Sequence, residues 1–256
     1  MLVKSKKSNN RMIQLLMMMV LVATIIIAAP LLIKGNAAHA ACIEDEAVPI
    51  KLGTTCGYLE TNDYYAPYKF KAPAKGKYIF RLNSPSFTAD FNAKFYNKNS
   101  EKYDYELYAY SNSYDLLTLS LKKGEIRYIR VDASSDYYPG KFRLTITRIV
   151  RPGNNKIIKI TKGKTLKNGK RKITVTYTKA KNAKNGYKVA VREKGKKKWT
   201  YYKRVNSLKK TITLKAKHTY EVKVRGYKCY QIGSGDYYNT TWRYSKKWSK
   251  VKRVTL

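Results

Sequence analysis

The chain has 256 residues, and its 54 Lys or Arg against 16 Asp or Glu give a formal net charge of +38 at pH 7. Only two His and three Cys occur, at spacings that match no zinc site, and the sequence contains neither a glycine-rich phosphate loop nor a serine elbow. Composition therefore predicts a protein that is not an enzyme and that has no catalytic residues, cofactor or metal.

The N-terminal segment has the pattern of an export signal. Four basic residues and no acid occupy the first eleven positions, and an apolar run follows from Met12 to Ile33. Ala38-His39-Ala40 then supplies small residues at alternate positions, which predicts a signal peptide over 1–40 with cleavage before Ala41. An uncleaved signal anchor is the alternative, because 22 residues at about 1.5 Å per helical residue can cross a bilayer of roughly 30 Å. Both predict a secreted or cell-surface protein that meets a membrane, if at all, only through this segment.

Cysteine spacing leaves two alternatives. Cys42 and Cys56 are near enough in sequence to close a short disulfide loop, worth about 3 kcal/mol by restriction of the unfolded chain, and Cys229 then has no partner. The alternative is that all three thiols stay reduced. Export allows the disulfide, since oxidising compartments preserve such bonds, whereas many bacteria of anaerobic habitats leave exported cysteines reduced.

Charge divides the remaining chain into two modules. Residues 42–150 contain 16 Lys or Arg against 13 Asp or Glu, a net +3, whereas residues 151–256 contain 33 against 3, a net +30. The change falls at Arg151-Pro152-Gly153-Asn154-Asn155, a turn-forming stretch that predicts a linker. We therefore expect one domain over 42–150 and a second, basic domain over 156–256.

Apolar and polar residues alternate with a period of two along both modules. Tyr68 to Lys71, Tyr78 to Leu82 and Phe142 to Ile146 show this pattern in the first, and Ile173 to Tyr177 and Tyr220 to Val224 show it in the second. Turn-forming clusters separate these runs at regular intervals. The pattern predicts an all-β chain with two antiparallel β-sandwiches after the N-terminal hydrophobic helix.

The first module resembles the bacterial pre-peptidase C-terminal domain, a small sandwich found beside secreted proteases. The resemblance implies an accessory role beside a secreted protease or glycosidase, and it transfers no catalytic residue. In chain order the matching elements are Asn62-Asp63-Tyr64, Tyr68-x-Phe70, Gly76-x-Tyr78-x-Phe80-x-Leu82, Ala89-Asp90-Phe91, Leu121-x-x-Gly124 with Tyr128-x-x-Val131, and Gly140-x-Phe142-x-Leu144.

Tyrosine is abundant in the first module, and four of these residues suggest a glycan-binding face. Tyr103, Tyr105, Tyr108 and Tyr110 lie within eight positions, and strand alternation aligns them in pairs. Exposed tyrosine rings offer a flat apolar surface with a hydroxyl at the rim, which suits a sugar ring. The alternative is that they fill the core and surface of a β-domain, where tyrosine is a preferred residue.

The second module resembles a Lys-rich bacterial fibronectin type III domain. The matching segments are KITVTYTKAKNAKNGYKVAVRE at 172–193, TYEVKVRGYK at 219–228 and YSKKWSKVKRV at 244–254. The resemblance makes Tyr177 the buried aromatic of the second strand, and Tyr220, six residues after Leu214, the tyrosine of a corner that bonds to the upstream backbone. Trp248 is the fourth residue that the resemblance identifies as fold-defining, and His218 falls in a surface turn.

The basic module determines the expected partner. A net +30 attracts polyanions, and outside a Gram-positive bacterium these include anionic cell-wall polymers and polysaccharides. Lys greatly outnumbers Arg, which favours diffuse attraction over bidentate phosphate recognition and argues against specific nucleic-acid binding. We expect adhesion to the cell wall through this module. A solvated, solubilising surface and an accessory role beside another extracellular protein are the alternatives.

Overall fold

The computed structural model describes residues 43–60, 65–85, 87–97, 102–134, 140–234 and 237–256. Apart from one short helix, α2 (Ile43–Glu46), the regular elements are β-strands, so the predicted all-β fold is confirmed. The predicted signal peptide, its cleavage site and Cys42 lie outside these ranges. Within them, no helix has the length and apolarity needed to span a membrane.

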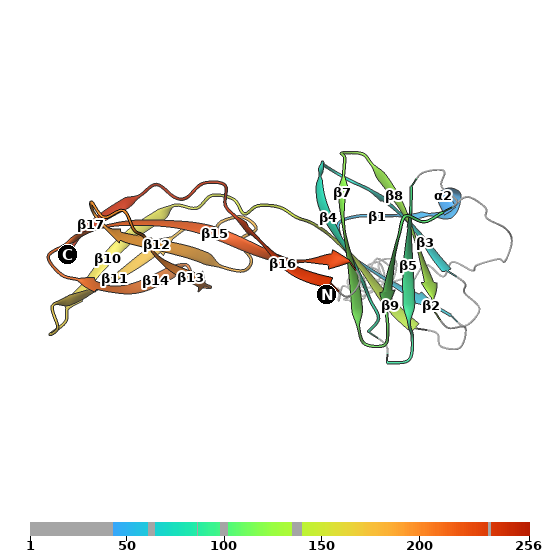
Figure 1. Cartoon of the computed structure of the whole chain (residues 1–256), viewed down its shortest axis with the longest axis horizontal. Helices are drawn as coiled ribbons and strands as arrows, with labels where there is room; N and C mark the ends of the chain where they lie inside the picture. The colour runs from blue at the N-terminus through green and yellow to red at the C-terminus, as the bar shows by residue number, and fades with distance from the viewer. Residues whose placement is uncertain (1–42, 61–64, 86, 98–101, 135–139, 235–236) are drawn as a thin grey trace, which may run out of the picture. The chain divides into compact units, whose positions relative to one another are not determined.

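The first nine strands form two sheets, which we call the first sandwich (Figure 1). One sheet has five strands, which are in spatial order β1 (Val48–Ile50), β3 (Tyr65–Lys71), β8 (Ile126–Ala133), β5 (Phe91–Tyr96) and β6 (Tyr105–Ala109). Its strand pairs with a described register are antiparallel, except that β1 runs parallel to β3. The four-stranded sheet contains β2 (Gly53–Leu59), β9 (Gly140–Arg148), β4 (Gly76–Asn83) and β7 (Tyr114–Leu121).

Phe142 of β9 packs the two sheets of the first sandwich together. Its ring centroid lies 6.2 Å from that of Tyr68 in β3 and 5.5 Å from that of Phe91 in β5, and all three side chains are buried. Gly57 of β2 lies directly against the same ring, where an added Cβ would overlap Phe142 Cζ. A glycine is therefore required at this point of the core.

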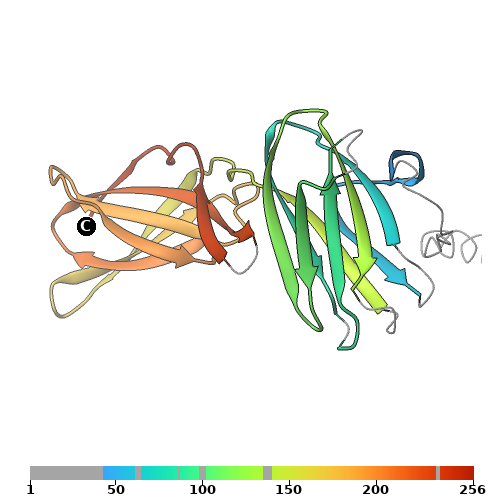
Figure 2. The ribbon, with the colours of Figure 1, turned by 45° about the vertical axis from the view of Figure 1, so that its right-hand side comes forward.

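The remaining strands form the second sandwich, whose layers are also visible in Figure 2. One sheet contains β10 (Ile157–Thr165), β11 (Lys170–Tyr177) and β14 (Lys209–Lys215). The other contains β13 (Thr200–Val205), β12 (Tyr187–Glu193), β15 (Thr219–Ser234) and β16 (Tyr237–Tyr244), with β17 (Lys252–Thr255) paired to β15. Inward-facing residues of both sheets, among them Ile173, Val189 and Val222, make one buried core.

Buried tyrosines fix the turns of the second sandwich. Tyr177 is fully buried in the core, and its hydroxyl donates to Ser207 O at 2.8 Å. Tyr220 donates to Lys215 O at 3.3 Å, five residues upstream, which is the contact expected of a tyrosine corner. Leu214 packs partly buried against the same core.

The segment 149–156 joins β9 to β10 without regular structure. It is held by hydrogen bonds to the second sandwich: Tyr230 Oη donates to Val150 O and accepts from Val150 N, both at 3.0 Å, and Gly153 N donates to Lys181 O at 2.8 Å. Pro152 and Asn155 are buried there. The predicted linker is therefore anchored along its length.

Contact density and hydrogen-bonded sheets divide the chain differently. By contact density, the described residues up to Lys71 form one compact unit with those of 81–115 and 125–145, and the described residues of 72–80, 116–124 and 146–256 form the other. That division passes through β4 and β7, whereas each sheet lies wholly before or wholly after the segment 149–156. The predicted domain bounds follow the sheets, and they stay a prediction.

Candidate functional site

The outer face of the β13-β12-β15-β16 sheet carries a dense set of cations. Val189 and Val191 of β12 and Val222 and Val224 of β15 are buried in the core. Because side chains alternate along a strand, the residues between and beside these valines face outward. The outward cations are Lys188 and Arg192 of β12 and Lys223 and Arg225 of β15.

Aromatic rings separate these cations, so that the two kinds of side chain alternate. Trp199, Trp248 and Tyr244 each have two cations at 3.9–5.8 Å from the ring centroid. Each such contact stabilises by about 0.5–1 kcal/mol when exposed and more when desolvated. We call the set the cation–aromatic row; in order of contact it comprises Arg192, Trp199, Lys223, Trp248, Arg225, Tyr244, Lys188 and Tyr201.

Crowding lowers the pKa values of the lysines in this row. Burial lowers the pKa of Lys223, and the positive charges of Arg192 and Arg225 lower it further. The pKa of Lys188 is lowered in the same way, by burial first and then by Arg225 and Lys203. An anion beside these lysines relieves the repulsion, because an opposite charge within about 4–6 Å favours the protonated form.

One carboxylate neutralises the row at its Arg192 end. Glu221 accepts from Arg192 Nη2 at 2.7 Å and from Arg253 Nε at 3.2 Å, and these two hydrogen bonds lower the pKa of Glu221. Lys188, at the other end, forms no ion pair within the part of the chain that the structure describes. The row is therefore neutralised at its Arg192 end and carries uncompensated positive charge at its Lys188 end.

A β-bulge places two cations of β13, in place of one, at the positive end. The ladder between β12 and β13 shifts register between Tyr187 and Val189, so that the extra residue on β13 leaves both Lys203 and Arg204 opposite Lys188. Arg204 adopts a φ of +55°, in the left-handed region, which costs a residue with a Cβ roughly 1–2 kcal/mol. Lys188, Lys203 and Arg204 therefore lie together, whereas a regular ladder would place only one residue of β13 opposite Lys188.

These cations and three aromatic rings line a pocket of about 240 Å³. The Tyr227 ring lies 5.3 Å from the Trp242 ring and 5.9 Å from the Tyr244 ring, and the Arg204 guanidinium lies 6.0 Å from the Trp242 centroid. The pocket can hold an anionic group beside flat apolar surfaces. We call it the cationic pocket; its lining residues, none of which is a carboxylate, are Lys188, Lys203, Arg204, Tyr227, Trp242 and Tyr244.

The four tyrosines predicted to form a glycan face are distributed over both sides of the five-stranded sheet. Tyr108 and Tyr110 line one groove on its outer side, and the ring of Tyr103 lies 5.7 Å from Lys94 Nζ of the adjoining strand. Tyr105 is the Cα partner of the fully buried Phe95, and directly opposed residues share a face. Tyr105 therefore has the orientation of the core-facing residues, in spite of its partial exposure.

The remaining predicted residues have simpler surroundings. Cys56 and Cys229 are free thiols among the described residues, and the predicted Cys42–Cys56 bridge stays a prediction because Cys42 lies outside them. His218 Nδ1 lies 3.0 Å from Glu193 Oε1 in a partly exposed turn. The described ranges hold no group of three or more His, Cys, Asp or Glu able to bind a metal.

Sequence reasoning identified the basic module but missed the row and the pocket. Their residues come from positions 188 to 248 and are adjacent only through strand pairing. A partial signal is present, since Lys188, Arg192, Lys223 and Arg225 occupy alternate positions of two runs with buried valines. Trp248 was identified as fold-defining, and the structure places it between Lys223 and Arg225 in the row.

No family model and no curated protein matches the chain. Similar solved structures include the pre-peptidase C-terminal domain of a collagenase from Bacillus anthracis, at 17% identity and a TM-score of 0.36, over 44% of this chain and 100% of that one. A cytokine receptor complex aligns at 14% identity and a TM-score of 0.28, over 66% and 88% of the two chains. The human OSCAR ligand-binding domain aligns at 10% and 0.28, over 80% and 100%. At these values no ligand or activity is inferred from them, and both family resemblances of the sequence stay predictions.

Proposed function

We propose that this protein is a non-catalytic, extracellular binding protein that holds an anionic cell-wall polymer or polysaccharide through the cationic pocket and the cation–aromatic row. The observation that carries the proposal is the bulge at Lys203 and Arg204, which gathers three cations around three aromatic rings. Strained backbone of this kind persists only where the surroundings enforce it, and it clusters at functional sites.

The chemistry of the pocket suits a sugar acid or a phosphorylated sugar. The face of a sugar ring can lie on Trp242 or Tyr227, while its anionic group lies among Lys188, Lys203 and Arg204. The row continues from Lys188 with further cations, so a polymer with regularly spaced charges can contact both. Lysine attracts such a polymer without demanding one geometry, whereas Arg192, Arg204 and Arg225 add planar donors.

Intrinsic fluorescence provides the test, because all three tryptophans of the chain, Trp199, Trp242 and Trp248, belong to the row or the pocket. The purified chain is titrated with oligogalacturonate, which carries carboxylates on sugar rings, and with polyphosphate, which carries charge without rings. The site variant is Lys203→Ser with Arg204→Ser. The control is Lys196→Ser with Lys197→Ser, which removes the same charge from two exposed positions between β12 and β13.

The site variant is expected to weaken oligogalacturonate binding about tenfold, equivalent to about 1.4 kcal/mol, and the control about twofold or less. Working near physiological ionic strength limits the control effect, since the Debye length is then about 8 Å. Equal losses in the two variants would show diffuse attraction with no site. Equal affinity for oligogalacturonate and polyphosphate would show that the aromatic rings do not contribute to binding.

A further inference from the structure

The outer face of the five-stranded sheet in the first sandwich contains a second, chemically different groove. Its volume is about 470 Å³, within the range of roughly 300–1,000 Å³ common for small-molecule sites. Strand register builds it: Tyr108, Asn92 and Asp132 are Cα partners across β6, β5 and β8. Its lining residues are Asn92, Lys94, Tyr108, Tyr110, Arg130, Asp132, Ala133 and Ser134.

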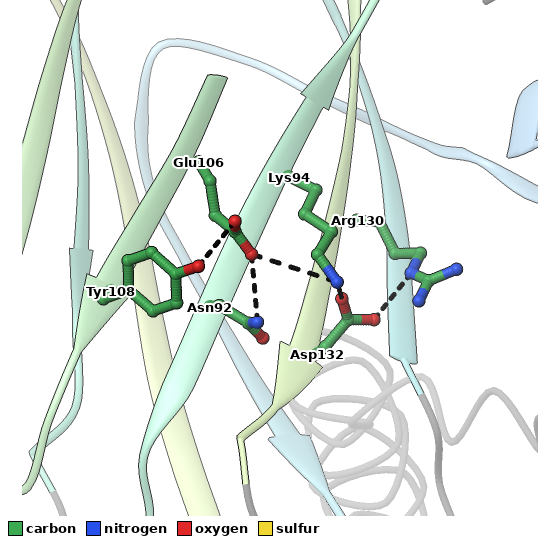
Figure 3. Close-up of polar contacts among 6 residues, drawn as sticks. All are labelled: Asn92, Lys94, Glu106, Tyr108, Arg130 and Asp132. Atoms are coloured by element: carbon green, nitrogen blue, oxygen red, sulfur yellow. Dashed lines mark hydrogen bonds and ion pairs between the residues drawn. The ribbon is translucent and has the colours of Figure 1, made fainter. Parts of the chain in front are cut away.

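A continuous polar network fixes the side chains at the base of this groove (Figure 3). Tyr108 Oη donates to Glu106 Oε2 at 2.6 Å, and Asn92 Nδ2 donates to Glu106 Oε1 at 3.1 Å. The hydrogen bond to Glu106, with desolvation, raises the pKa of Tyr108 to about 12. The Tyr108 hydroxyl therefore remains a donor, and its ring is held in place at the edge of the groove.

The other half of the network pairs cations with carboxylates. Lys94 Nζ lies 3.2 Å from Asp132 Oδ2 and 3.9 Å from Glu106 Oε1, and Arg130 Nε donates to Asp132 Oδ1 at 2.6 Å. Two positive and two negative side chains thus balance one another, in contrast to the cationic pocket. A groove with balanced charge gives no electrostatic preference for a polyanion or a polycation.

Hydrogen-bonding capacity and apolar surface remain for a ligand. Arg130 lines the groove and uses only Nε in its bond to Asp132, which leaves the Nη groups of its guanidinium as donors. Tyr108 and Tyr110 expose 46% and 63% of their surface. The groove therefore presents the charged donors of Arg130 and two exposed aromatic rings within one rigid frame.

We propose that this groove binds a neutral pyranose sugar, with Tyr108 and Tyr110 against the ring face and with Arg130 bonded to its hydroxyls. A sugar ring has apolar C–H faces and an edge of hydroxyls that both donate and accept. Its lack of charge matches the balanced network. This site is independent of the anionic-polymer site proposed for the second sandwich.

The test titrates the purified chain with three neutral trisaccharides, maltotriose, cellotriose and triacetylchitotriose, by saturation-transfer NMR and calorimetry. Polygalacturonate is the anionic comparison. A NaCl concentration of about 1 M, where the Debye length is roughly 3 Å, suppresses attraction by the basic sandwich. Tyr110→Ala is the main variant, because this side chain is the most exposed of the groove tyrosines and its removal leaves the network intact. Tyr58→Ala is the control, since Tyr58 is an exposed tyrosine, 46% exposed like Tyr108, but lies on β2 of the other sheet.

We expect at least one neutral trisaccharide to bind, with an affinity about tenfold lower in Tyr110→Ala, or about 1.4 kcal/mol, and unchanged in Tyr58→Ala. Tyr108→Phe should also weaken binding, because it frees the ring from Glu106. No saturation transfer from any of the three sugars at about 10 mM, tenfold above a dissociation constant of about 1 mM, would overturn the proposal. Equal binding by Tyr110→Ala and the unsubstituted chain, or binding of polygalacturonate alone, would overturn it too.

Discussion

Arg204 has a backbone conformation that few residues with a Cβ adopt. Its φ of +55° leaves it and Lys203 opposite a single residue of β12. The left-handed region costs such a residue roughly 1–2 kcal/mol, and glycine avoids most of that cost. An arginine here exchanges local stability for a third cation at the pocket, which is the trade expected at a binding site.

Arg204→Gly should therefore separate stability from binding. Relief of the left-handed strain, partly offset by the greater freedom of glycine in the unfolded chain, is expected to raise the free energy of unfolding by up to about 1 kcal/mol. Oligogalacturonate affinity should fall in the same variant. Urea denaturation and fluorescence titration measure the two quantities.

Lys217→Gly provides the control for this substitution. Lys217 has a similar φ of +63°, carries the same charge and lies outside the pocket lining. It should gain stability as Arg204→Gly does but retain affinity. If Arg204→Gly bound the polymer as tightly as Lys217→Gly, the special role of Arg204 would be refuted.

At the scale of elements, strand faces are set by burial and by close contacts between neighbouring strands. Gly57 of β2 admits no side chain, because the Phe142 ring of β9 occupies the space where a Cβ would lie. Such overpacking typically costs about 1–3 kcal/mol. The contact links two neighbouring strands of the four-stranded sheet to the core.

Gly57→Ala should lower the free energy of unfolding by about 1–3 kcal/mol, and Phe142→Leu should do so by loss of buried surface. In the double variant the smaller side chain leaves room for the new methyl group. The combined loss should then be smaller than the sum of the two single losses by about 0.5 kcal/mol or more. Additive losses in chemical denaturation would show that the two residues are not in contact.

Elements and sites differ in how far the sequence could predict them. Alternation at Ile173 to Tyr177 and Tyr220 to Val224 indicated strands, because a buried face imposes a period of two, and the structure has β11 and β15 there. The bulge at Lys203 and Arg204 has no such signal, since glycine or asparagine usually marks a positive φ. Tyr105 was grouped with Tyr108 by proximity, whereas register places it opposite Phe95 on the other side of the sheet.

At the scale of the whole molecule, the charge is divided very unequally between the two sandwiches. Residues 151–256 carry a net +30 and residues 42–150 a net +3. The structure adds local differences to that division: the cationic pocket has no carboxylate among its lining residues, and the groove at Asn92 balances two cations with two carboxylates. Net charge alone would attract a polyanion to every exposed lysine. A specific site is therefore demonstrated only by a measurement that locates the bound polymer at particular residues.

NMR titration of the isotope-labelled chain with oligogalacturonate distinguishes a specific site from diffuse attraction by the basic sandwich. We expect the largest chemical-shift changes at Lys188, Lys203, Arg204 and the Trp242 indole, then along the row to Lys223. Signals of the groove at Asn92 should stay unchanged. Shifts of similar size at exposed lysines throughout the second sandwich, with no maximum at the cationic pocket, would show that the pocket is not the binding site.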